Sequence, residues 1–147
     1  MREDADNERD LVDVLTAEHR AVESLFADVE TTSDRTLRQE TLAAVLAELR
    51  RHAAMEERYL YPATRAHLPA GDALAAHELR ERAEADAKMD RLAGLDESDP
   101  EYEPLMSALF TDIRDHVHEE ETELFPRLRA ACDRETLRRL GSDAAGT

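Results

Sequence analysis

Two stretches of the chain repeat one pattern of histidine and glutamate. Residues 52–62 read His-Ala-Ala-Met-Glu-Glu-Arg-Tyr-Leu-Tyr-Pro, and residues 116–126 read His-Val-His-Glu-Glu-Glu-Thr-Glu-Leu-Phe-Pro. Both match His-x-x-x-Glu-Glu-x-x-Leu-aromatic-Pro. Because residues four apart lie above one another on a helix face, the imidazole and the first carboxylate of each repeat can converge on one point. This geometry suits metal ligation.

The candidate ligands lie on apolar helix faces, where a histidine is usually a satisfied core residue. A single His–Glu pair would favour that interpretation. Two such pairs with two further inward histidines would bury several poorly compensated polar groups unless a cation binds them. We therefore predict a metal centre with the ligands His19, His52, Glu56, His77, His116 and Glu120.

The residue types narrow the choice of metal. Imidazole and carboxylate ligands suit iron, zinc or manganese, and the lack of an inward thiolate argues against a structural zinc site. Six ligands exceed the needs of one tetrahedral ion. Two carboxylates from facing helices can bridge two ions and leave two histidines for each, which predicts a dinuclear centre.

Four amphipathic helices are expected to position these ligands, because apolar residues recur at steps of three and four. The seam of the second helix keeps these steps from Leu42 to Ala63. The third helix has the least apolar face. The first helix is predicted to run from an N-cap at Asn7 to a break at 31–34, and the second from there to a turn at 68–72. The third is predicted from about Ala73 to about Leu92, after a cap at Asp72. An acidic linker with Pro100 precedes the fourth, which is predicted over 105–128, and a short helix is predicted after Cys132, up to Gly141.

The composition supports an all-α fold. Only 4% of the 147 residues are aromatic, and four Gly and five Pro leave little material for hairpins. We predict one domain over residues 1–147 that folds as an up-down-up-down four-helix bundle, with its core at about 8–132 and a flexible tail at 142–147. Separate caps and turns disfavour an extended coiled coil.

The charge limits the partners. With 35 acidic and 19 basic residues, the net charge of -16 disfavours binding to nucleic acid or to an anionic membrane. No apolar run approaches a membrane span and the start does not resemble a signal peptide, so we expect a cytoplasmic protein that is a monomer or a weak homo-oligomer. Cys132, the single cysteine, is expected to be inert.

The ordered set of His19, two His-x-x-x-Glu motifs with Leu-aromatic-Pro endings, and an intervening His77 resembles the hemerythrin family, in particular its HHE cation-binding branch. The resemblance spans residues 11–128. Ferritin-like diiron bundles differ because they use Glu-x-x-His. The resemblance implies a non-haem centre of two iron ions with an oxo or hydroxo bridge. It also implies that Glu56 and Glu120 bridge the ions, and that His19 pairs with His52 and His77 with His116.

The third helix departs from the family pattern. Oxygen-carrying hemerythrins have His-x-x-x-His there, whereas His77 is followed at the fourth position by Glu81. The missing histidine implies an open position on each iron. It favours reactivity toward peroxide, dioxygen or nitric oxide, as in catalase-like turnover or protection from oxidative or nitrosative stress. The alternative is an iron or oxygen sensing module without turnover. Glu81 either binds the second iron or pairs with Lys88 or an arginine.

The remaining conspicuous residues are expected to lie outside the site. Tyr59, one turn beyond Glu56, and Tyr61 could hydrogen-bond a ligand of the metal, although core packing is the more common role of such residues. Four further residues are expected to face solvent, pair with arginine or meet a helix end: Glu57, His67, His118 and Glu121.

Overall fold

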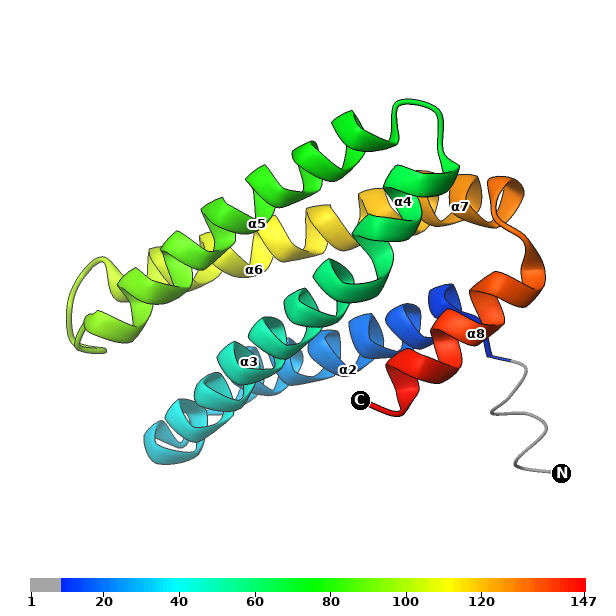
Figure 1. Ribbon diagram of the computed structural model, residues 1–147. Coiled ribbons are helices and arrows are strands. Elements are labelled where there is room, and N and C mark those ends of the chain that lie inside the picture. Colours follow the sequence, from blue (N-terminus) through cyan, green and yellow to red (C-terminus); the bar gives the residue numbers. More distant parts are fainter. Residues whose placement is uncertain (1–8) are drawn as a thin grey trace, which may run out of the picture.

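The computed structural model describes residues 9–147 and shows an all-helical fold, in which these residues include no strand. Successive long helices run in opposite directions and form the predicted four-helix bundle (Figure 1). None of the helices in the described part of the chain is long and apolar enough to cross a membrane. The elements are α2 (Leu11–Thr31), α3 (Arg35–Met55), η1 (Glu56–Leu60), α4 (Tyr61–His67), α5 (Gly71–Gly94), α6 (Tyr102–Glu119), η2 (Glu120–Leu124), α7 (Phe125–Ala131) and α8 (Arg134–Ala145).

Side-chain caps begin the first two helices. Asp10 caps α2 in a reciprocal capping box with Asp13, and Asp34 caps α3. The predicted cap at Asn7 lies outside the described residues. The predicted cap of the third helix at Asp72 is wrong, because α5 already begins at Gly71 after Ala70 in the left-handed region with φ 57°.

The second and fourth long helices each contain one π-helical turn. Pro62 and Pro126 carry no amide hydrogen, so neither can donate the regular helical bond. In the turn before each proline, the amides of Tyr61 and Phe125 instead donate to carbonyl oxygens five residues back, those of Glu56 and Glu120. The extra residue rotates the face that follows. The predicted seam residues beyond Glu56, Tyr59 and Ala63, are buried as expected, but the π-helical turn also brings Leu60 and Tyr61 into the core.

Two apolar clusters fill the bundle, one at each end. The cluster nearer the α2–α3 turn contains Val22 and Leu49, and the cluster under α4, α7 and α8 contains Leu15, Leu60 and Leu124. Along each of α2, the second long helix and the fourth long helix, the candidate ligands come between residues of the two clusters. The ligands thus form a polar layer across the middle of the bundle.

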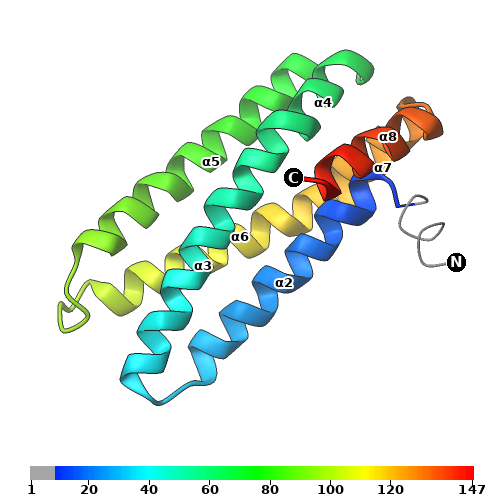
Figure 2. The same ribbon diagram turned by 60° about the horizontal axis from the view of Figure 1, so that its bottom comes forward.

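The C-terminal helix α8 packs against α2 (Figures 1 and 2). Leu137 and Ala144 are buried in the core, and Gly141 lies so close to the chain at Asp10 that a Cβ there would be 2.5 Å from the carbonyl carbon. The Tyr59 hydroxyl lies 3.0 Å from Oγ1 of Thr147. The predicted end of the helix at Gly141 and tail from residue 142 are therefore wrong, because this helix continues to Ala145.

Candidate metal centre

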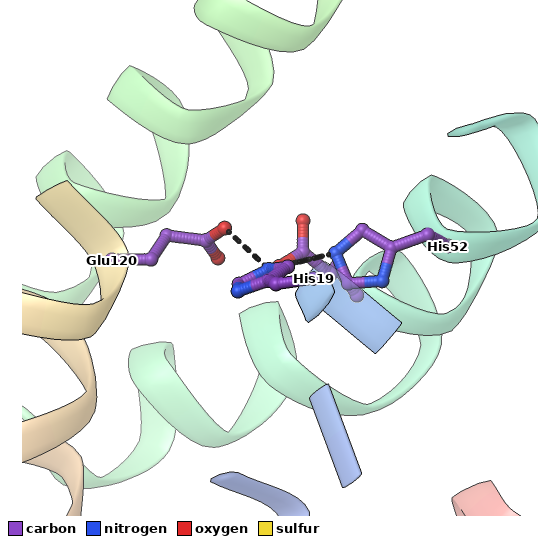
Figure 3. Close-up of side chains that lie close together, drawn as sticks. His19, His52 and Glu120 are labelled. Carbon is purple, nitrogen blue, oxygen red and sulfur yellow. Dashed lines mark hydrogen bonds and ion pairs between the residues drawn. The ribbon is translucent and has the colours of Figure 1, made fainter. Parts of the chain in front are cut away.

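Four buried side chains from three long helices of the bundle form the first half of the polar layer. Nε2 of His19 lies 3.1 Å from Nε2 of His52 and 3.5 Å from Oε1 of Glu120. Nε2 of His52 lies 3.3 Å from Oε2 of Glu56. Figure 3 shows the two imidazoles and the Glu120 carboxylate facing one another. All four offer a ligand atom within 4.8 Å of the others, which is close enough to surround one cation.

The second half lies around His116 and shares Glu120 with the first. Nε2 of His116 lies 3.0 Å from Oε2 of Glu78, 3.2 Å from Oε1 of Glu120 and 3.9 Å from Oε1 of Glu56. The oxygens of Glu56 thus face His52 on one side and His116 on the other. Two groups of donors that share a carboxylate offer space for two cations next to one another.

The buried carboxylates are poorly compensated by the protein. Glu56, Glu78 and Glu120 are at most 4% exposed, and each has a carboxylate oxygen without a hydrogen-bond donor among residues 9–147. Burial, with the adjacent charge of Glu56, raises the pKa of Glu120 to about 7. Unpaired buried charges are costly, and a bound cation removes that cost. The donor set therefore fits a metal centre.

The pKa values of Glu56 and His52 depend on each other. Burial disfavours the charged form of each, but the charge of His52 and hydrogen bonds hold the pKa of Glu56 well below its usual range. In turn, the charge of Glu56 and the hydrogen bond that His52 donates to Glu18 overcome burial and raise the pKa of His52 to about 10. Protons on His52 and His116, whose pKa values are both raised by neighbouring carboxylates, thus partly neutralise the cluster in the place where a metal ion would supply the positive charge.

Each inward histidine also bonds a carboxylate on its outer side. Nδ1 of His52 lies 2.6 Å from Glu18, Nδ1 of His19 lies 2.7 Å from Glu121, and Nδ1 of His116 lies 2.6 Å from Glu81. A carboxylate that accepts from Nδ1 leaves the lone pair of Nε2 directed inward and fixes the ring. This arrangement is common among histidines that bind metals.

Arginines hold two of the three outer carboxylates. Arg51 pairs with Glu18, and Arg20 with Glu121. The third, Glu81, instead contacts His77, whose Nε2 lies 2.7 Å from Oε1 of the same carboxylate. Glu81 thus lies behind His116 rather than among the inward donors.

Five of the six predicted ligands meet in the polar layer, and His77 does not. Its side chain is 43% exposed and contacts Glu81 and Glu119, while its neighbour Glu78 points inward and is 4% exposed. A signal for Glu78 is present in the sequence, because the buried residues of α5 follow one helical seam. This seam consists of Ala75, Glu78, Ala85, Met89 and Leu92.

The other residues singled out from the sequence have structural contacts. The Tyr59 hydroxyl donates to the carbonyl oxygen of Asp143 on α8, whereas Tyr61 is buried, and burial with the charge of nearby Glu56 raises the pKa of Tyr61. Glu57 pairs with Arg82. Cys132 is buried in the core, and burial raises the pKa of its thiol.

A cavity of about 240 Å³ reaches the polar layer between α3, α5 and α6. His52, Glu56 and His116 line its inner part. Apolar side chains contribute to its wall, and acidic side chains surround the part nearer the surface. The lining residues outside the polar layer are Leu49, Ala53, Tyr61, Glu81, Arg82, Glu84, Ala85, Asp86, Met89, Asp112, Ile113, Asp115 and Glu119.

Comparison with known proteins agrees with this geometry. The "DNA nickase" of Nostoc sp. (strain PCC 7120 / SAG 25.82 / UTEX 2576) is 29% identical over 117 residues, which are 80% of this chain but only 33% of that relative. The crystal structure of a hemerythrin HHE cation binding domain-containing protein from Mycobacterium kansasii, an Rv2633c homolog, has the same fold. It matches with a TM-score of 0.80 and 24% identity, covering 94% of this chain and 84% of that one. The model of the hemerythrin HHE cation binding domain matches residues 10–128, and the chain therefore belongs to this family of cation-binding domains.

Proposed function

We propose that the polar layer binds two iron ions. His19 and His52 would bind one ion, and His116 with Glu78 the other, while Glu56 and Glu120 bridge them. The observation that carries this proposal is the shared position of Glu120, which belongs to both groups of donors. Nitrogen and oxygen donors without a thiolate suit iron. In this assignment Glu78 takes the position expected for His77.

The ligand set favours oxidation chemistry over reversible oxygen carriage. Three imidazoles and three carboxylates place more negative charge on the ions than a histidine-rich set, and hard anionic oxygens favour the higher oxidation state of iron. Bound iron ions would supply paired one-electron redox chemistry, which suffices for the two-electron oxidation or reduction of a peroxide. The chain buries the centre between two apolar clusters, and a cavity between α3, α5 and α6 reaches it from the surface.

We propose that the substrate is a small oxidant or a diatomic gas, with hydrogen peroxide as the first candidate and dioxygen and nitric oxide as further ones. Peroxide turnover would convert two molecules of hydrogen peroxide into two of water and one of dioxygen. This chain matches only a third of the DNA nickase, so the activity named for that relative is not assigned to this chain. The net charge of -16 favours an uncharged partner over a nucleic acid.

The test begins with metal analysis and visible spectra of iron-loaded protein, followed by measurement of dioxygen release from hydrogen peroxide. We expect two irons per chain and release faster than that by an equal amount of free iron. One iron or none refutes the dinuclear site. Two irons without turnover refute the enzymatic role and leave the sensing or binding module.

Two variants of adjacent residues test the ligand assignment. Glu78→Ala is expected to lose one iron per chain, because it removes a buried donor beside His116. His77→Ala, the matched control, is expected to retain two, because that side chain lies outside the polar layer. Loss of iron from the His77 variant alone would restore the assignment made from the sequence.

A further inference from the structure

The cavity between α3, α5 and α6 connects exposed residues with the candidate metal centre. Its lining includes Glu84 and Asp115, which are exposed, as well as His52 and Glu56, which are buried. A molecule of a few atoms that enters beside Glu84 would therefore meet the inward donors along a path whose wall includes Leu49 and Met89 of one apolar cluster.

The lining is acidic, although Asp112 is paired with Lys88. Outside the polar layer it includes one arginine, Arg82, which is already paired with Glu57 and Asp86. Neither Glu84 nor Asp115 has an ion-pair partner among residues 9–147. The six lining carboxylates outside the polar layer are Glu81, Glu84, Asp86, Asp112, Asp115 and Glu119.

A second hollow, of about 190 Å³, lies between α2 and α6 but gives poorer access. Of the six inward donors it touches only His19, and on that side the imidazole is bonded to Glu121, which Arg20 also holds. The bridging carboxylates do not line it. The cavity between α3, α5 and α6 is the one of the two that reaches a bridging carboxylate and histidines of both donor groups.

We propose that this cavity is the access route to the metal centre and that its acidic lining selects uncharged molecules over anions. A negative field in a narrow opening with apolar walls repels anions and leaves neutral molecules unaffected. This inference rests on the proposed function, and it narrows the substrate to neutral hydrogen peroxide or a neutral gas. Superoxide and other anionic oxidants are excluded as efficient substrates.

The charge is tested with Glu84→Lys, and Glu40→Lys is the matched control. Both glutamates are exposed, but Glu40 precedes Glu56 by sixteen residues, about 24 Å along the helix, and does not line the cavity. Azide serves as the anionic probe, and its rate of binding to the oxidised, iron-loaded protein is followed in the visible spectrum. We expect Glu84→Lys to accelerate azide binding by about threefold or more at low salt. The difference should disappear near 1 M salt, and the second-order rate of hydrogen peroxide consumption should not change.

The route is tested with Ala53→Phe, for which Ala54→Phe is the control on the same helix. Ala53 lines the cavity, whereas Ala54 is exposed and does not. Filling the cavity is expected to slow both azide binding and peroxide consumption by about tenfold, while iron content stays at two per chain. Equal azide rates in the Glu84 and Glu40 variants overturn the selection by charge. Equal rates in the two alanine variants overturn the route.

Iron content and peroxide turnover are measured on the same samples, so that the two proposals fail in different ways. Wild-type protein with fewer than two irons or without turnover refutes the proposed function. Wild-type protein with two irons and full turnover, combined with azide binding that is insensitive to both kinds of variant, refutes only the access route.

Discussion

Glu120→Gln is expected to stabilise the metal-free protein while it removes a shared ligand of the metal centre. Glu120 is fully buried, and neither of its carboxylate oxygens has a hydrogen-bond donor among the described residues. In the absence of a cation, an ionised carboxylate at this place faces Glu56 and pays the cost of burial. Glutamine keeps the size and the polarity of the side chain and removes the charge.

The magnitude follows from the pKa of Glu120. Burial and Glu56 raise it to about 7 in the folded chain from 4.5, the value for an exposed carboxyl. Each tenfold change in an acid constant corresponds to about 1.4 kcal/mol, so the ionised carboxylate costs about 3 kcal/mol of folding free energy. Because the pKa of Glu120 is raised in the folded chain, the contribution of its protonated form to the free energy of unfolding is fully present below pH 4.5. This contribution is lost as the pH rises through about 7.

The assay is urea unfolding of chelator-treated protein at pH 4.5 and at pH 8. At pH 8 the variant should be more stable than wild type by about 3 kcal/mol, or by roughly 6–12 °C in Tm. At pH 4.5 the two should be equal, because wild-type Glu120 is then neutral. Glu123→Gln is the control, since Glu123 is in the same π-helical turn but exposed. Iron loading should reverse the order at pH 8, because only wild type keeps the shared ligand.

A metal-free Glu120→Gln protein that is less stable than wild type at pH 8 would refute this reasoning. It would mean that the ionised carboxylate is compensated within the protein, by His116 or His19. The polar layer would then not need a cation to offset the cost of its buried charge. An equal gain for Glu123→Gln would point to the general acidity of the chain instead.

Three further substitutions test the surroundings of the site. Glu18→Gln should weaken metal binding about 10- to 100-fold in competition with a chelator, because it removes the carboxylate that orients His52, whereas Glu48→Gln should not. Gly141→Ala should lower the free energy of unfolding by about 1–3 kcal/mol in urea, because its Cβ would collide with the backbone before α2. Tyr59→Phe should lower the free energy of unfolding by about 1 kcal/mol and leave the visible spectrum of the iron-loaded protein unchanged, because the hydroxyl contacts Asp143 and Thr147 rather than the centre.

The fold and most of the site could be predicted because their signals are local. Helix bounds follow from caps and from steps of three and four, and the convergence of His52 with Glu56 requires only one turn of helix. The same holds for His116 and Glu120. His19 was placed by its position between apolar neighbours on α2, and its meeting with His52 then follows from the antiparallel packing of the bundle.

The failures arise where two local signals compete. Two helix faces of α5 differ by a shift of one residue. One contains Leu74, His77 and Glu81, and the other contains Ala75 and Glu78. The first has a histidine, which suggested a ligand, but the second continues through smaller and apolar side chains that fit the core. Packing against the other helices selects the second face. The π-helical turns were not predicted for a similar reason. A proline in the middle of an apolar seam indicates a bend, but it does not specify to which carbonyl oxygen the preceding amides donate.

The outer carboxylates depend on contacts between helices, which the sequence does not specify. Glu18 on α2 holds a histidine on α3, and Glu81 on α5 holds a histidine on α6, while Glu121 on η2 holds a histidine on α2. Each of these bonds both orients an imidazole and joins two helices. Metal binding, which pulls the three Nε2 atoms toward common points, must therefore also tighten the bundle across α2, α3, α5 and α6. Glu18, Glu81 and Glu121 thus form a second layer of carboxylates around the centre, and this layer couples the occupancy of the site to the stability of the fold.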